Sequence, residues 1–436
     1  MPAFPRSLAL AGFLLCPVNL PAAQIGPWLG ELMQDHERVR SARATVDAAI
    51  QREQVARGDW FPTLDVTANV GHERQDKPGG TVTQLDFDEL KIGVSQLIYD
   101  FGATGAAMEK ANIDISLASA GLTREEQSLL LDAVSAWANL IRARDVLAFA
   151  KQSEENIRRQ TGLEEVRIQA GSGLSTDLLQ AKTQLAGAMA RRVDSEGGLA
   201  TARHRFQAVF RKPPPVLEQL QPVGIAENLL PSDLETALAI ASLENPDIEE
   251  AALQAASAYQ DLRASGSAYF PTLEAKFEHN YKDDSGGTVG FQEETLVKLE
   301  LSYEFNLGFT NINAVAASRL DASAADDNVV ETRRGTEEAV RNAWQQLDTA
   351  RRKAMHLSDQ ADIAKAFLDL AVEERTLGQR SLIDVLSGET SWINARSDAV
   401  AARTDVVLAA AELLRAIGRF TPDTVITTPS PPMAGR

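Results

Sequence analysis

The tetrapeptide Phe61-Pro62-Thr63-Leu64 returns as Phe270-Pro271-Thr272-Leu273, at an offset of 209 residues. Further residues return at an offset of 207: His72, Gly79-Gly80-Thr81-Val82, Ser95, Trp137, Gly171 and Asp177 recur as His279, Gly286-Gly287-Thr288-Val289, Ser302, Trp344, Gly378 and Asp384. A nearly constant offset over so many positions indicates a tandem structural duplication. We expect the first repeat to occupy residues 24–218 and the second residues 219–420.

The change of two residues in the offset falls between Leu64 and His72. An even insertion keeps every side chain on its own face of a strand, because strand side chains alternate with period two. In the second repeat apolar residues alternate with charged and polar ones, which predicts a strand with one apolar face. The residues of that face are Val297, Leu299, Leu301, Tyr303 and Phe305. We predict four strands, at about 64–74, 90–99, 273–283 and 296–307.

Helices are predicted over most of the remaining chain, because strong helix formers dominate and the longest stretches contain no proline. The predicted helices are Leu32 to Arg57, about 104–169, a helix ending at Phe210, Leu234 to Arg263, about 311–376, and a helix ending at Ile417. Their lengths would let one long helix run beside two shorter helices stacked end to end. The proline-rich tail, residues 421–436, is expected to be disordered.

Composition limits the possible functions. The chain has 436 residues and a net charge of −18, which argues against nucleic acid as a partner, because such affinity comes from Lys and Arg on phosphates. Residues 1–23 have the pattern of a secretory signal peptide, and they contain the only cysteine, Cys16. The alternative is an ordinary apolar N-terminal helix. No motif for a metal, a phosphate or a catalytic nucleophile occurs, so we expect no metal, no cofactor and no enzymatic activity.

The apolar residues are arranged for strands rather than for membrane-spanning helices. No run after the predicted signal approaches the roughly 18 apolar residues of such a helix, so a membrane crossing would have to use strands. Four amphipathic strands are too few for a closed barrel, since even small barrels have about eight. The chain would have to oligomerise to close one, and three copies would supply twelve strands.

The order of these elements resembles the TolC-like outer-membrane efflux proteins over about residues 29–418. It runs from a helix through Phe-Pro, a strand pair, Tyr99-Asp100-Phe101-Gly102, a long helix and a glycine turn to a further helix, and then repeats. The resemblance implies a mainly α fold with a β-barrel portion: a homotrimer with a twelve-stranded barrel in outer-membrane lipid, on a tube of long helical hairpins in the periplasm. Such ducts work with a periplasmic adaptor protein and an inner-membrane transporter.

Two stretches are most similar to the family members that serve type I protein secretion through an ABC transporter: Gln96 to Gly102 and Gly171 to Asp177. We favour that branch. The drug-efflux branch differs from it only slightly and stays open as an alternative. An alternative from another class is a soluble helical adaptor or scaffold, although four alternating strands argue against it.

The resemblance also implies a periplasmic gate. Asp177 and Asp384 would form rings of like charge that narrow the entrance and attract cations, and Arg380 would pair with Asp177 to hold it shut. The alternatives are an acid that complements a helix N-terminus and an exposed turn arginine. The family often carries a second aspartate three residues beyond the second-repeat one, where this chain has Ser387.

The hairpin turns are expected to meet the adaptor, and their glycines would supply the backbone freedom that tight turns need. The predicted contact residues are Gly171, Gly173, Leu174, Ser175, Gly378, Ser381 and Leu382. The repeat mates Trp137 and Trp344 are expected to be core residues.

Overall fold

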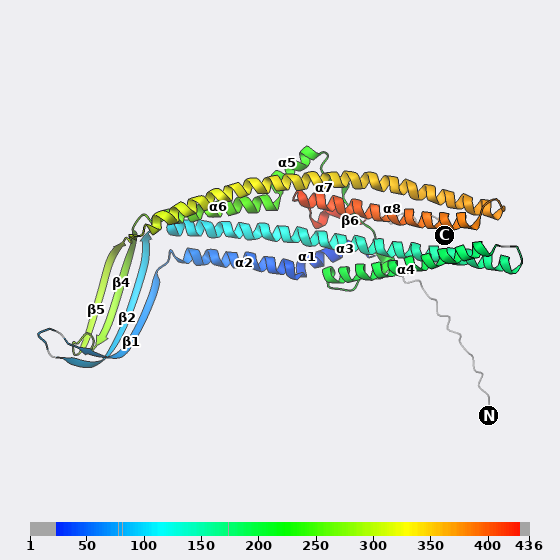
Figure 1. Cartoon of the computed structure of the whole chain (residues 1–436). Coiled ribbons are helices and arrows are strands. Elements are labelled where there is room, and N and C mark those ends of the chain that lie inside the picture. The colour runs from blue at the N-terminus through cyan, green and yellow to red at the C-terminus, as the bar shows by residue number, and fades with distance from the viewer. Residues whose placement is uncertain (1–22, 77, 81, 173, 428–436) are drawn as a thin grey trace, which may run out of the picture.

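The computed structural model describes residues 23–427, apart from 77, 81 and 173. The molecule is a long rod of helices with a small sheet bent away from one end (Figure 1). Within the described part of the chain, no helix combines the length and the apolar character needed to cross a bilayer.

In the described part of the chain each repeat contains four α-helices, and the two sets correspond closely. They are α1 (Ile25–Asp35), α2 (Glu37–Gly58), α3 (Ala103–Gln169) and α4 (Ser175–Phe210), followed by α5 (Leu234–Glu244), α6 (Pro246–Ser267), α7 (Thr310–Thr376) and α8 (Leu382–Ala416). The long helices α3 and α7 have 67 residues each, which at ~1.5 Å per residue is roughly 100 Å. Each long helix packs against the α2 or α6 helix of its repeat and forms a hairpin with the helix after it.

The prediction of one opening helix in each repeat is wrong, because both helices are broken. In the first repeat the break is at His36, whose Nδ1 accepts a hydrogen bond from the Arg38 backbone N–H at 3.2 Å. Burial, together with Arg211 and Arg38, lowers the pKa of His36, which favours the neutral ring that can accept this bond. In the second repeat Asn245 caps α6, and Pro246 occupies its first position.

Four antiparallel strands form the bent sheet: β1 (Thr63–Gln75), β2 (Thr83–Tyr99), β4 (Thr272–Asp283) and β5 (Phe291–Ser302), in the order β1-β2-β4-β5. All four predicted strands are present, but β2 and β5 begin several residues earlier than predicted. Tyr303 and Phe305, predicted to continue the last strand, lie beyond its end. The chain there leaves the sheet for a turn in which Phe309 has a φ of 56° and donates its N–H to Asn306 O at 3.0 Å.

The motif Tyr99-Asp100-Phe101-Gly102 is the corresponding turn in the first repeat. Phe101 and Gly102 have positive φ values, and Asp100 Oδ2 accepts a hydrogen bond from Thr104 N at 2.6 Å. The carboxylate thereby satisfies a backbone donor in the first turn of α3. Phe101 stacks on Phe270 with ring centroids 4.6 Å apart, which joins the two repeats where sheet and helices meet.

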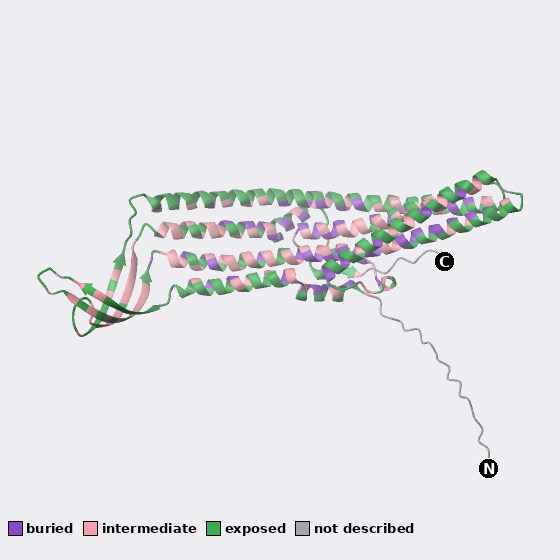
Figure 2. Ribbon diagram, turned by 60° about the horizontal axis from the view of Figure 1, so that its bottom comes forward, coloured by how far each residue is buried: buried purple, intermediate pink, exposed green. Residues whose placement is uncertain are grey.

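The main hydrophobic core lies midway along the rod, where the end-to-end helices meet the long ones (Figure 2). Trp137 is fully buried there, and Trp28 packs edge-on against it at 6.1 Å. Trp344, the repeat mate, is only partly buried against the same core. Trp137 Nε1 donates to Gln221 O at 3.0 Å, so the buried indole is satisfied.

A two-stranded sheet covers this core and corrects the prediction for the tail. β3 (Val223–Ile225), in the segment between the repeats, pairs with β6 (Val425–Thr427), which follows a short 3₁₀ turn at Pro422–Thr424. The first seven residues of the predicted disordered tail are therefore ordered, and the rest of it lies outside the described residues. Ala23, the last residue of the predicted signal, forms a parallel bridge with Leu220.

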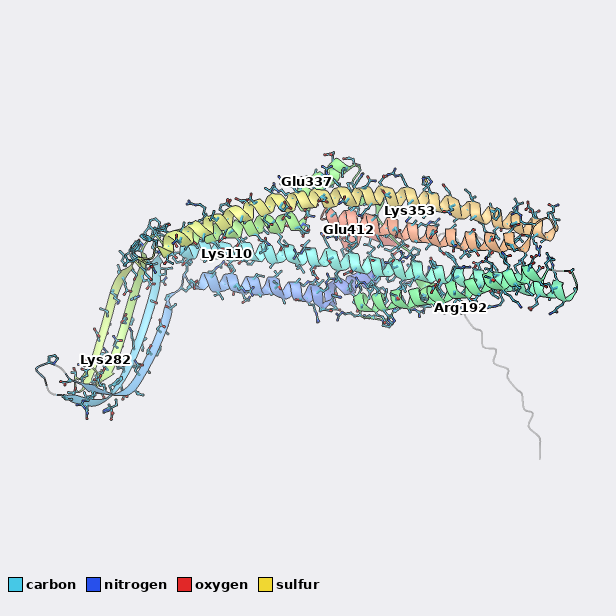
Figure 3. All side chains as sticks on the ribbon, viewed as in Figure 1. Lys110, Arg192, Lys282, Glu337, Lys353 and Glu412 are labelled. Atoms are coloured by element: carbon cyan, nitrogen blue, oxygen red, sulfur yellow. The ribbon has the colours of Figure 1, made fainter. Side chains whose placement is uncertain are left out.

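Charged side chains tie neighbouring helices together along the rod. Lys110 of α3 donates to both carboxylate oxygens of Asp261 in α6, at 2.7 and 2.6 Å. Farther along, Arg192 of α4 pairs with the buried Glu154 of α3 at 2.6 Å. Figure 3 places Lys110 near the sheet and Arg192 in the far hairpin, so these bonds lie in different parts of the rod.

Candidate functional site: the two hairpin tips

The first hairpin turns between the end of α3 and Ser175, the first residue of α4. Gly171 has a φ of 78° there, and Ser172 donates its N–H to Arg167 O at 3.0 Å. Leu174 is the N-cap of α4 and provides no side-chain hydrogen bond. Gly171, Leu174 and Ser175 are exposed, as a docking surface would require. Gly173 lies outside the described residues.

Asp177 lies in the first turn of α4 and is half-buried. It has no ion-pair partner among the residues that the structure describes. Its position near a helix N-terminus is favourable for a negative charge. The carboxylate is thus available to interact outside its own hairpin.

The second hairpin makes the same turn with different chemistry. Gly378 has a φ of 77°, and the backbone bonds around it match those at Gly171. Here the cap is Ser381, whose Oγ accepts a hydrogen bond from Asp384 N at 3.2 Å. The Asp384 side chain is exposed, and no ion pair joins it to another described residue.

Arg380 takes a partner in its own hairpin, Glu374 of α7, rather than Asp177. Its Nε donates to Glu374 Oε2 at 2.5 Å, and its guanidinium lies 5.3 Å from the centre of the Phe367 ring. The proposed Arg380–Asp177 pair is therefore not made within one chain. An arginine can reach the glutamate six residues earlier because the turn folds the chain back over the end of α7.

An ion pair that sequence reasoning missed joins the two hairpins just above their tips. Arg375 Nη2 of α7 donates to Glu164 Oε2 of α3 at 2.9 Å, and Arg375 Nη1 donates to Arg380 O at 3.2 Å. Glu164 is only 4% exposed. A buried carboxylate is costly unless it is paired, so this bond fixes the second tip against the first hairpin.

The signal for this pair lay in the repeat alignment. At the offset of 207 residues, Glu164 aligns with Ala371 and Arg375 aligns with Ile168. Ala371 is buried in the second hairpin. A charged residue at a position whose repeat mate belongs to the core indicates a buried charge that needs a partner.

Leu382 has a different role from the predicted one. It is 1% exposed and packs with Ile157 of α3, Ala181 and Ala188 of α4, and Leu386 of α8. It therefore joins the hairpins to each other and is not offered to a partner protein. Of the predicted contact residues in the second turn, Gly378 and Ser381 are exposed.

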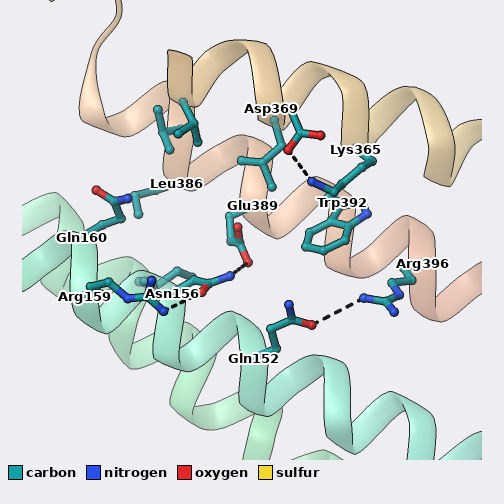
Figure 4. A pocket seen from close by; sticks show the side chains of 14 residues that line it. Gln152, Asn156, Arg159, Gln160, Lys365, Asp369, Leu386, Glu389, Trp392 and Arg396 are labelled. Atoms are coloured by element: carbon teal, nitrogen blue, oxygen red, sulfur yellow. Dashed lines mark hydrogen bonds and ion pairs between the residues drawn. The ribbon is translucent and has the colours of Figure 1, made fainter. Parts of the chain in front are cut away.

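A cavity of about 660 Å³ separates α3 from the α7–α8 hairpin above this contact (Figure 4). Glu389 of α8 is 7% exposed and points across the gap to α3, where Asn156 Nδ2 donates to its Oε1 at 2.9 Å. Burial raises the pKa of Glu389, and the Asn156 bond, Lys365 and Arg159 only partly offset it. The carboxylate is thus a second polar link between the hairpins.

The sheet at the other end of the molecule carries the predicted apolar face. Val297, Leu299 and Leu301 are exposed, Val297 by 76%. Register puts them on the same face as Leu64 and Val66 of β1, which are exposed too. An exposed apolar surface of this extent marks contact with lipid or protein.

Comparison with known proteins adds a family to this geometry. The model of the family described as "Outer membrane efflux protein" matches residues 28–209 and 237–419, so it finds both repeats. The outer membrane efflux protein BepC of Brucella suis biovar 1 (strain 1330) is 24% identical over 386 residues, which are 88% of this chain and 83% of BepC. The proteases secretion protein PrtF of Dickeya chrysanthemi is 21% identical over 84% of this chain and 82% of its own.

The fold is likewise shared with solved structures. The outer-membrane channel OprN superimposes with a TM-score of 0.78 at 20% identity, over 90% of this chain and 89% of that one. Proteins named TolC are also among the relatives. These matches confirm the predicted TolC-like resemblance and the outer-membrane location, and they leave the adaptor or scaffold alternative without support. Across both of its repeats, this chain belongs to the outer membrane efflux protein family, whose members are transport channels rather than enzymes.

Proposed function

We propose that three copies of this chain form an exit duct from the periplasm through the outer membrane. The observation that carries the proposal is the open sheet: β1 and β5 each have one unpaired edge, and one face is apolar and exposed. Unpaired strand edges are not tolerated in lipid. Pairing β5 of one copy with β1 of the next removes both edges, and three copies close a ring of twelve strands.

The two faces of the sheet support this arrangement. The apolar face, with Val297, Leu299 and Leu301, would contact lipid. The opposite face carries ion pairs between neighbouring strands, including Lys276 with Glu300 at 2.6 Å and Lys91 with Glu278 at 3.1 Å. This polar face would line the water-filled interior.

A matched pair of substitutions tests the assignment of the faces. Leu299→Arg places a charge on the lipid face, which costs ~2–4 kcal/mol at the bilayer midplane, and it should not accumulate in the outer membrane. Glu300→Gln, one residue away on the other face, should assemble as the parent does. Native mass spectrometry in detergent should give a trimer. A stable monomer, or equal behaviour of the two variants, would refute the trimeric duct.

The hairpin tips form the periplasmic entrance in this proposal. Three copies of Asp177 and of Asp384 would surround the axis, where crowded carboxylates repel one another and attract cations. The exposed turn residues would receive the periplasmic adaptor: Gly171, Leu174, Ser175, Gly378 and Ser381. In the trimer, Arg380 can exchange Glu374 for Asp177 of a neighbouring copy.

We further propose that the inner-membrane transporter is of the ABC type and that the cargo is a secreted polypeptide. The similarity to a protease secretion protein supports this branch, while the similarity to an efflux protein supports multidrug efflux as the second candidate. Deleting the chain distinguishes them. Loss of a polypeptide from the medium with unchanged drug susceptibility supports secretion, and the reverse supports efflux.

A further inference from the structure

The loop between β4 and β5, residues 284–290, packs against the outer part of the β1–β2 hairpin, which continues past the last β2–β4 pair, Asp88 with Asp283, and bends across the ends of β4 and β5 (Figure 1). Its Gly287 N–H donates to Glu73 Oε1 of β1 at 2.5 Å, and Ser285 Oγ donates to Glu89 of β2. The sheet order is β1-β2-β4-β5. The loop therefore contacts side chains of both strands of that hairpin, including the edge strand β1.

The loop lies on the polar face. Glu73 and Glu89 belong to the alternating set that includes Lys91, which pairs with Glu278. On β2, the residues of this set nearest the loop are half-buried while their neighbours on the other face are exposed: Thr83, Leu85, Phe87 and Glu89. Partial burial that follows the polar face alone indicates that the loop covers that face.

The fit beneath the loop is close. A Cβ on Gly287, which has a φ of 70°, would lie 2.7 Å from Gln75 Oε1 and 3.0 Å from Thr83 Oγ1. Any other residue at position 287 would be strained by this φ and would press on the Gln75 and Thr83 side chains.

The loop also holds its own shape. Asp284 Oδ1 accepts a hydrogen bond from Gly290 N at 2.6 Å, and Asp284 N donates to Gly290 O at 3.3 Å, so the two ends are closed on each other. The first repeat has a loop at the same place, and its Gly79 has a φ of 81°; no atom of the described residues lies within 4 Å of the position that a Cβ on Gly79 would take.

We propose that residues 284–290 are a lid that narrows the outer end of the duct. The inference rests on the proposed trimer, in which the polar face lines the interior. Three copies of the loop would then project inward from three sides, above the ion-paired section of the wall. Large solutes would have to displace the lid by breaking the bonds to Glu73 and Glu89, whereas small ions would pass it.

A cysteine below the lid tests this inference. Thr67 lies on the polar face opposite Lys91, about 20 Å from Glu73 at ~3.3 Å per strand residue. The chain has one natural cysteine, within the predicted signal. Cells that express Thr67→Cys are treated from outside with a small and a bulky membrane-impermeant maleimide, and the ratio of the bulky to the small labelling rate is measured.

Gly287→Ala should raise this ratio several-fold, because the new methyl group displaces the loop from Gln75 and Thr83. Glu73→Ala should raise it too, and it avoids strain at a glycine. Gly79→Ala is the matched control, since it introduces the same strain at a position where no described atom lies near the new methyl group, and it should leave the ratio unchanged. A trimer in which all four proteins give one ratio would refute the lid alone. Failure to form a trimer would refute the duct itself.

Discussion

The two hairpin tips share a backbone and differ in chemistry. Both long helices have 67 residues, and both turns place a glycine of positive φ at positions 207 residues apart. The second tip caps its own helix with Ser381 and reaches across to Glu164 through Arg375. The first tip has no side-chain cap at Leu174, and its Asp177 has no ion-pair partner among the described residues. The two hairpins thus keep the same backbone turn, while substitutions let the second tip bond to the first hairpin through Arg375.

Breaking the cross-hairpin ion pair should have the largest effect. Arg375→Ala removes the 2.9 Å partner of the buried Glu164 and leaves it only Arg167, at 3.7 Å, so the cost should approach the roughly 3 kcal/mol of a broken buried ion pair. The thermal midpoint of the purified protein, followed by circular dichroism in detergent, should fall markedly. In planar bilayers, the single-channel conductance should rise because the tips separate more easily.

The repeat itself supplies the compensating change for this pair. The double variant Glu164→Ala/Arg375→Ile installs the residues found at the mates, Ala371 and Ile168. It removes both charges together and should recover most of the lost stability, because replacing a buried pair with apolar residues is often neutral. If the double variant is as unstable as Arg375→Ala, the ion pair is not what joins the hairpins.

A second prediction compares Glu389 with its mate Lys182, which is exposed and pairs with Glu165 at 3.2 Å. Because burial raises the folded-state pKa of Glu389, its favourable contribution is complete below the unfolded pKa. That contribution is lost as pH rises through the folded value. Glu389→Gln should therefore stabilise the protein near neutral pH, by about 1.4 kcal/mol for each unit of the shift.

The measurement for Glu389 is the thermal midpoint as a function of pH. The difference between Glu389→Gln and the parent should shrink as the solution is acidified. Lys182→Gln serves as the control and should change the midpoint little at any pH. A constant difference between Glu389→Gln and the parent across the pH range would contradict the assignment.

A third prediction exchanges the two caps, since Leu174 and Ser381 are repeat mates. Ser381→Ala should cost about 1 kcal/mol, and Leu174→Ser should contribute a similar amount, because a serine N-cap satisfies a free backbone N–H. Hydrogen exchange at the first turns of α8 and α4 would report each change locally. Exchange should become faster in α8 for Ser381→Ala and slower in α4 for Leu174→Ser. A change of the same sign in both helices would contradict the difference in capping between the two hairpins.

The smallest expected effect on stability is at Arg380. Its pair with Glu374 is partly exposed, so Arg380→Ser should cost only ~0.2–1 kcal/mol. In planar bilayers its conductance should nevertheless rise, because fewer cations offset the tip carboxylates. Asp384→Ala should weaken cation selectivity instead. Variants that conduct and select like the parent would place the constriction elsewhere.

Periodicity in the sequence predicted much of the fold. The proline-free stretches gave both long helices to within a residue, and strict alternation gave Val297, Leu299 and Leu301 their common face. The helix breaks escaped detection because His36 is an unusual cap whose acceptor depends on a neutral ring. The ordered tail escaped detection too, since Val425 becomes a strand only by pairing with Ile225, two hundred residues away.

The tip chemistry was predictable only in part. The positions of Asp177, Arg380 and Asp384 followed from the turn pattern, but their partners depend on which helix faces which. The bond between Glu164 and Arg375 needs the packing of α3 against the second hairpin, and no local pattern encodes that packing. Comparing each residue with its repeat mate would have flagged Glu164 as a charge at a core position.

The two tryptophans that are repeat mates lie at the same distance from the ends of the two long helices. Trp137 and Trp344 lie at the mid-rod core, and each is followed by 32 residues of its long helix, an arm of about 48 Å at ~1.5 Å per residue. A tilt of about 5° at the core would carry each tip through about 4 Å over such an arm. A small change in packing at this core would therefore move each hairpin tip by more than the 2.9 Å that separates Arg375 from Glu164.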